Sequence, residues 1–140
     1  MIINSKTTTQ SKSFFRFILI ALISLSTNSF AESYKCLLAG TTLNEKPFLE
    51  ASIEQWGSLD LNGNIATFLN GISKSTEKLN YIETINDKDS SRLVYGKSEF
   101  GISTAINFVK YKDPNKTYWL QYGATRNDKT LKQYYNCGKN

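Results

Sequence analysis

Residues 100–111 read FGISTAINFVKY, and the order of their side chains predicts a long β-strand. Every second residue falls on the same face of such a strand, because side chains alternate with a period of two. One face carries Phe100, Ile102, Thr104, Ile106 and Phe108. The other face carries the smaller or more polar set, Gly101, Ser103, Ala105, Asn107, Val109 and Tyr111.

Two further strands follow this one along the chain. Residues 113–116, Asp-Pro-Asn-Lys, predict a turn, since proline sets φ and Asp and Asn bond to local backbone. Residues 117–124 then alternate again, residues 126–129 form a second turn, and residues 130–137 complete the series. The three segments are expected to form an antiparallel meander.

The first half of the chain shows the same turn chemistry. Asn62-Gly63 lies between two apolar runs and predicts a hairpin with a type I′ turn, and Asn70-Gly71 repeats the signal. Residues 73–79 are expected to form one helical turn. The remaining short β-prone segments are residues 34–39, 48–55, 58–61, 64–69, 80–85 and 92–96. With eight or nine strands in total, the fold class is all-β: a small antiparallel barrel or sandwich.

Cys36 and Cys137 are the only cysteines and stand near the two ends of this region. We expect a structural disulfide, because a zinc site would need further thiolate or imidazole ligands and Cys-x-x-Cys spacing is absent. The bond would close a loop of about 100 residues, which the chain-entropy model values at about 4–5 kcal/mol. If the first and last strands are neighbours, the arrangement suits a closed barrel best.

Residues 1–31 have the pattern of a cleaved secretory signal peptide. Lys6, Lys12 and Arg16 accompany the apolar run FFRFILIALISL, and Ser29-Phe30-Ala31 matches the small-residue cleavage pattern. Cleavage after Ala31 would leave residues 32–140 as a single domain in the periplasm or outside the cell. That domain holds fourteen basic and twelve acidic residues, a formal charge of +2. We therefore expect neither nucleic-acid binding nor stable membrane insertion after cleavage.

Catalytic groups are scarce in this sequence. The chain has no histidine, and it has no phosphate-binding glycine loop and no G-x-S-x-G or H-E-x-x-H motif. Glu45, Glu50 and Glu54 are the carboxylates that a hydrolase could use, but the alternation in residues 48–55 turns Glu50 and Glu54 outward together. We expect no enzyme activity, no catalytic residue, no metal site and no cofactor.

Aromatic side chains provide the positive indication of function. Tyr and Trp combine apolar area with a polar tip and are enriched at interfaces. If Tyr118, Leu120 and Tyr122 face inward, then Trp119 and Gln121 face outward and become candidate binding residues. Residues 95–101, with two glycines around Lys97, Ser98 and Glu99, are expected to form a functional loop.

Tyr34-Lys35-Cys36 near the start of the domain and Tyr135-Asn136-Cys137 near its end carry a resemblance in plan to the bacterial c-type lysozyme inhibitors. The resemblance implies a small periplasmic barrel that blocks an enzyme's cleft with a loop. It covers the cysteine placement and the strand count, and this chain has no match to the family's inhibitory segment, so no site residue is carried over.

The expected function is an exported protein-binding module, an inhibitor or immunity-type factor whose partner is another protein. Two alternatives remain from the sequence. The first is a barrel that carries a small molecule or lipid in its interior. The second is a hydrolase that depends on carboxylates alone.

Overall fold

The computed structural model describes residues 31–49 and 54–140, and the statements below concern those residues. Ala31–Asn140 forms one compact unit. The signal-peptide prediction covers residues 1–31, of which residues 1–30 lie outside the described residues, and it stays a prediction. In the described part no helix is long and apolar enough to cross a membrane. The strands are β1 (Glu32–Leu43), β2 (Lys46–Leu49), β3 (Trp56–Asn62), β4 (Ile65–Leu69), β5 (Thr76–Asn86), β6 (Ser90–Glu99), β7 (Ile102–Tyr111), β8 (Tyr118–Arg126) and β9 (Lys129–Lys139).

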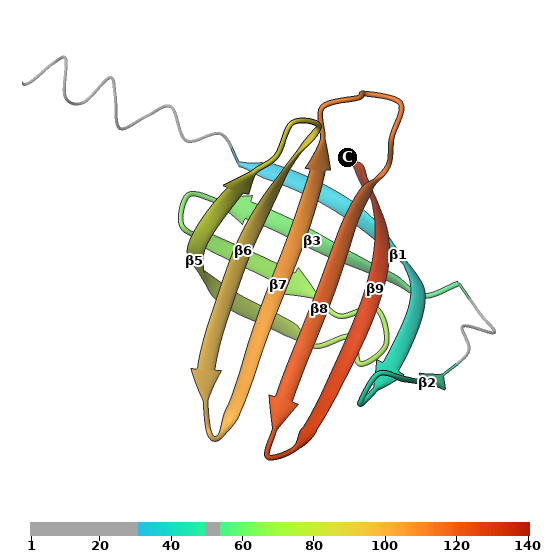
Figure 1. Ribbon diagram of the computed structural model, residues 1–140, viewed down its shortest axis with the longest axis vertical. Coiled ribbons are helices and arrows are strands. Elements are labelled where there is room, and N and C mark those ends of the chain that lie inside the picture. The colour runs from blue at the N-terminus through green and yellow to red at the C-terminus, as the bar shows by residue number, and fades with distance from the viewer. Residues whose placement is uncertain (1–30, 50–53) are drawn as a thin grey trace, which may run out of the picture. The chain divides into compact units, whose positions relative to one another are not determined.

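The strands form a closed antiparallel barrel (Figure 1). From β3 to β9 each strand pairs with the next in sequence, β1 pairs with β3, and β9 pairs back with β1. Eight strands therefore close the barrel, whereas β2 pairs only with the end of β1, at Thr41, Thr42 and Leu43. The prediction of an all-β fold is confirmed, and of its two forms the barrel is the one observed.

The disulfide joins the two strands that close the barrel. Cys36 on β1 and Cys137 on β9 lie directly opposite each other, with their Cα atoms 4.1 Å apart. Both are buried in the core. The bond connects residues separated by 101 positions in sequence. The predicted disulfide between the first and last barrel strands is confirmed.

The barrel interior is filled by side chains that alternate with outward-facing residues, as a two-residue period requires. The Tyr34 and Phe108 ring centroids are 4.7 Å apart, and those of Phe68 and Tyr122 are 5.1 Å apart. The buried apolar residues are Tyr34, Cys36, Leu38, Leu59, Leu61, Ala66, Phe68, Leu79, Tyr95, Ile106, Phe108, Leu120, Tyr122, Tyr135 and Cys137. All eight barrel strands contribute to this set.

Two local expectations from the first half of the chain need correction. The β3–β4 hairpin exists, but Asn62 pairs with Ile65, so Gly63 and Asn64 are the central turn residues. Gly63 has φ 60° and is the one central residue with positive φ, which matches a type II′ turn and not type I′. Residues 73–79 form no helical turn, because β5 begins at Thr76 and pairs with β4 from there.

Candidate functional site

The turn between β6 and β7 presents an aromatic side chain directly to solvent. Glu99 pairs with Ile102, so Phe100 and Gly101 alone make the turn. Their φ angles are 52° and 75°, as a type I′ turn requires of both central residues. Phe100 is 95% exposed, the highest value among the exposed large hydrophobic residues of the described chain.

The predicted loop over residues 95–101 is therefore wrong in its conformation. Lys97, Ser98 and Glu99 belong to β6 and pair with β7, and only Phe100 and Gly101 leave the ladder. The two glycines do not flank a flexible loop, and each has a different structural role. Gly101 occupies the left-handed turn position, whereas Gly96 is buried within the strand and lies against Ile82 of β5.

The sequence places Phe100 both at the start of the predicted strand over residues 100–111 and within the predicted loop over residues 95–101, but it indicates only Lys97, Ser98 and Glu99 of that loop as candidate binding residues. The dipeptide Phe100-Gly101 between two alternating runs was the available signal. A glycine at the second central position is typical of a type I′ turn, but such turns favour Asn, Asp or Gly at the first. Bulky residues with positive φ are outliers, and outliers of this kind concentrate at functional sites.

Other turns lie beside this one at the same end of the barrel (Figure 1). Ile102 pairs with Arg126, so the β8–β9 turn is adjacent to the β6–β7 turn. The β1–β2 turn follows, since the backbone N–H of Asn44 donates to the Thr130 carbonyl over 2.9 Å. Phe100 thus stands on a rim of short hairpins held by strand pairing.

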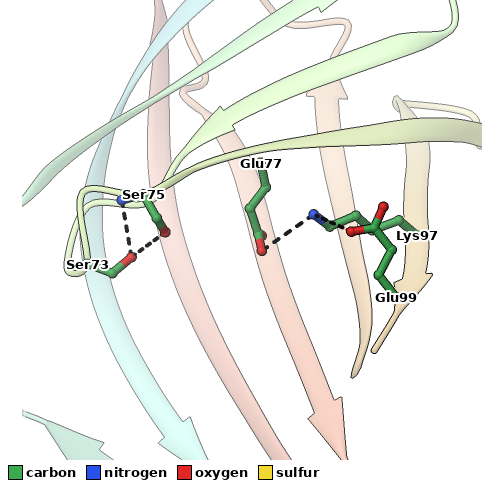
Figure 2. Close-up of polar contacts among 5 residues, drawn as sticks. All are labelled: Ser73, Ser75, Glu77, Lys97 and Glu99. Carbon is green, nitrogen blue, oxygen red and sulfur yellow. Dashed lines mark hydrogen bonds and ion pairs between the residues drawn. The ribbon is translucent and has the colours of Figure 1, made fainter. Parts of the chain in front are cut away.

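Behind Phe100 the barrel end holds a small hollow of about 160 Å³. Its lining residues are Glu77, Lys97, Glu99, Phe100, Ile102 and Thr104. Figure 2 shows the Lys97 ammonium between two carboxylates, 3.8 Å from Glu77 Oε1 and 3.9 Å from Glu99 Oε2. Two carboxylates and one ammonium leave the hollow with an excess of one negative charge.

Glu77 lines this hollow with a partly buried side chain, 23% exposed. Its Oε2 atom is enclosed and has no hydrogen-bond partner among the described residues. Burial raises the pKa of the Tyr122 phenol, and interaction with the Glu77 carboxylate raises that pKa further. Tyr122 therefore keeps its proton beside the Glu77 carboxylate.

The β4–β5 turn closes the other side of this barrel end. The Asn70 side-chain oxygen accepts hydrogen bonds from the backbone N–H groups of Ile72 and Ser73, at 2.9 and 3.1 Å. The Gly71 N–H donates to the Tyr135 hydroxyl, which in turn donates to Gln133. Burial raises the pKa of Tyr135 to about 12, so this hydroxyl remains a donor at physiological pH. The turn is thus tied to the barrel wall.

Two hydroxyl groups lie at the outer end of the same turn. Figure 2 shows Ser73 and Ser75 facing each other, with their Oγ atoms 2.7 Å apart. Both residues are exposed. The two hydroxyl groups form a hydrogen bond with each other and add polar surface to the rim.

The predicted site residues fall in two separate places. Lys97 and Glu99 share the inward side of β6 with Tyr95, whereas Ser98 faces outward, 3.4 Å from Ser103 Oγ. Trp119 and Gln121 lie on the outer face of β8, where both line a different hollow. Leu120 and Tyr122, which alternate with them along β8, are buried. The predicted outward orientation of Trp119 and Gln121 is therefore confirmed.

Of the three candidate carboxylates of a hydrolase, the two that the structure describes, Glu45 and Glu54, do not line this hollow. Glu45 lies in the β1–β2 turn and forms an ion pair with Lys132. Glu54 is exposed, and Glu50 lies outside the described residues. Within residues 31–49 and 54–140 no group of three or more His, Cys, Asp or Glu side chains is placed to hold a metal ion.

Comparison with known proteins assigns no family to this chain. No protein-family model and no curated protein sequence matches it. The resemblance to the c-type lysozyme inhibitors therefore stays a prediction from the cysteine placement and the strand count. The fold and the geometry of the barrel end are the basis for assigning a function.

Proposed function

We propose that this protein is an exported protein-binding module, an inhibitor or immunity-type factor, that inserts the β6–β7 hairpin tip into an apolar pocket of its partner. Phe100 is the anchor of this interaction, and the hollow behind it receives a basic side chain of the partner. The module contributes no catalytic group of its own.

The conformation of Phe100 is the single observation that carries the proposal. A non-glycine residue in the left-handed region costs about 1–2 kcal/mol, and a fully exposed ring recovers almost nothing by packing within the barrel. The barrel would be more stable with Asn at this position. Insertion of the Phe100 ring into a pocket of the partner would account for a bulky residue at this position, because buried aromatic anchors dominate the binding energy at protein interfaces.

The charge behind Phe100 supports a partner with a basic residue beside its pocket. Glu77 and Glu99 outnumber Lys97 among the charged residues that line the hollow. An Arg or Lys side chain that enters the hollow would contact both carboxylates and the edge of the aromatic ring. Charge-assisted hydrogen bonds of this kind are about twice as strong as neutral ones.

The packed interior supports binding at the surface over transport inside the barrel. Tyr34, Phe68, Phe108 and Tyr135 are fully buried and occupy the space that a carrier would leave for its cargo. An eight-stranded barrel has an interior just wide enough for its side chains or for one small ligand. Here side chains take that space.

Export is supported by two features of different kinds. The first 31 residues have the pattern of a secretory leader. The Cys36–Cys137 bond belongs to the type of structural disulfide that persists in oxidising compartments such as the periplasm. Both agree with a partner that is met outside the cytoplasm.

Site-specific cross-linking tests the proposal directly. The photoreactive analogue p-benzoylphenylalanine replaces Phe100 in the exported protein, and a matched variant carries it at Ile85. Ile85 is also exposed, 37%, but pairs with Arg92 at the other end of β6, about 23 Å along the strand from Glu99. We expect a discrete protein adduct from position 100 in the periplasm or culture fluid, and none from position 85.

A charge test identifies the partner's side of the contact. Glu99→Lys should abolish the adduct by repelling a basic residue, whereas Glu83→Lys, an exposed change on β5, should leave it intact. Absence of any protein adduct from position 100, or the same adducts from positions 85 and 100, would refute the hairpin as a binding element.

A further inference from the structure

A second group of functional side chains lies on the outer face of β6–β9. Arg92 pairs directly with Val109, Val109 with Trp119, and Trp119 with Asn136. The four residues therefore form one row across four strands. At about 4.8 Å between neighbouring strands the row is about 14 Å long. This surface is independent of the hairpin tip proposed above.

Trp119 separates two open hollows on this face. One has a volume of about 400 Å³ and is lined by Arg92, Asn107, Val109, Trp119 and Gln121. The other has a volume of about 490 Å³ and is lined by Tyr111, Asn115, Lys116, Thr117, Trp119 and Asn136. A ligand that covers Trp119 would reach both hollows.

The aromatic part of the surface is a shallow ledge. The Trp119 side chain is 39% exposed, and its ring centroid is 6.1 Å from that of Tyr134, with 32° between the ring planes. The face of an aromatic ring is electron-rich. Such a face attracts the partially positive C–H groups on the flat side of a sugar ring.

Amide side chains surround this ledge. Asn107, Gln121 and Asn136 make no side-chain hydrogen bond to any described residue. Each amide offers two donor hydrogens and an acceptor oxygen, and a sugar hydroxyl likewise donates and accepts. The three amides and the ring thus offer what recognition of a hydroxyl-rich ligand requires.

The charge of the surface is one-sided. The outward positions of strands β6–β9 carry no Asp or Glu, and neither hollow has an acidic lining residue. Arg92 forms no ion pair within the described residues, and the Lys116 ammonium lies over the Tyr111 ring at 5.2 Å. Each hollow thus has one cation among its lining residues, Arg92 in one and Lys116 in the other, and no carboxylate, which favours a negatively charged ligand.

We propose that this outer face binds an acidic glycan, a chain of sugars that bear carboxylate or sulfate groups. One sugar ring stacks on Trp119, the amides of Asn107, Gln121 and Asn136 bond to its hydroxyls, and Arg92 pairs with an acidic group. A protein partner fits this face less well, because the core of a protein interface is a sealed, mostly apolar patch. Here open hollows and unpaired amides surround the exposed Trp119 indole.

The two tryptophans of the chain make a direct optical test possible. Trp56→Phe leaves Trp119 as the sole indole and keeps an aromatic ring beneath Lys35, which now lies 4.5 Å from the Trp56 ring centroid. The reverse change, Trp119→Phe, leaves only the Trp56 indole, which lines neither hollow. The probes are hexasaccharides of galacturonic acid and of hyaluronan and a heparin-derived hexasaccharide, with neutral cellohexaose for comparison.

We expect a saturable change in emission from the Trp56→Phe protein with at least one acidic probe, and none from Trp119→Phe. By calorimetry, Trp119→Ala should weaken binding of that probe about tenfold or more, as loss of a stacked ring does elsewhere. Arg92→Gln should weaken it about tenfold and bring the affinity near that of cellohexaose. Trp56→Ala, a change at a tryptophan outside both hollows, should leave the affinity unchanged.

Several results would overturn the assignment. They are no response to any acidic probe, equal affinity for cellohexaose and the acidic probes, and undiminished binding by Trp119→Ala. Should Trp119→Ala melt early in circular dichroism, Gln121→Ala replaces it, and unchanged affinity in that variant would count equally against the glycan site.

Discussion

Replacing Phe100 by Asn separates the cost of this residue to the fold from its value in binding. Phe100 has φ 52° and is 95% exposed, so the change removes almost no native packing. Asn is one of the few residues that adopts the left-handed conformation readily, and Asn-Gly is the favoured sequence of a type I′ turn. The expected gain in the free energy of unfolding is about 0.5–1 kcal/mol.

Thermal unfolding followed by circular dichroism measures this gain. For a domain of this size the gain corresponds to a rise in Tm of about 3–6 °C. Gly101→Ala is the matched control, because a Cβ at this glycine would meet nothing within 4 Å while φ is 75°. Its effect is therefore one of backbone strain alone, and we expect a loss of about 1 kcal/mol.

The two measurements together decide the role of Phe100. The more stable Phe100→Asn protein should also fail to compete with the native protein for its partner, since the anchor is gone. A fall in Tm of several degrees in Phe100→Asn would refute the reasoning. It would mean that the exposed ring supports the barrel and that its conformation is no evidence of binding.

Two further predictions concern the stability of the barrel. Changing Cys36 and Cys137 together to Ala should lower the free energy of unfolding, measured in urea, by about 2–5 kcal/mol, because the bond joins residues 101 positions apart. A loss below about 1 kcal/mol would show that the pairing of β1 with β9 keeps the barrel closed without the disulfide. Glu32 accepts hydrogen bonds from the Tyr34 hydroxyl at 2.6 Å and from Lys110 at 2.9 Å. The Tyr34 bond lowers the pKa of Glu32 below its usual 4.5, burial opposes this, and Lys110 adds to the lowering. The stabilisation is therefore present above pH 4.5 and is lost as the pH falls through the lower folded-state pKa. Glu32→Gln should flatten the pH dependence of unfolding below pH 4.5, and an unchanged slope would contradict this assignment.

Alternation and turn chemistry were sufficient to predict most of the strands. Residues 100–111, 117–124 and 130–137 correspond to β7, β8 and β9 within about two residues at each end. The outward orientation of Trp119 followed from the same period. Such features depend on near neighbours in the chain, so a single sequence carries them.

The conformation of the turns was harder to predict from the sequence. Residues 95–101 contain two glycines and polar side chains and thus resemble a loop, yet pairing with β7 holds Lys97, Ser98 and Glu99 in β6. The same pairing forces the reversal into Phe100 and Gly101. Ladder hydrogen bonds formed with another strand outweighed the local preference of the segment.

Alternation, turn residues and cysteine placement indicate an all-β domain whose two cysteines lie on the first and last strands of the barrel. The closure of β9 onto β1, the position of Lys97 between Glu77 and Glu99, and the hollow that Arg92 shares with Trp119 emerge from the folded barrel. Strand register explains this difference. Alternation shows which side chains share a face of one strand, but the pairing of strands sets which side chains from distant segments stand opposite one another.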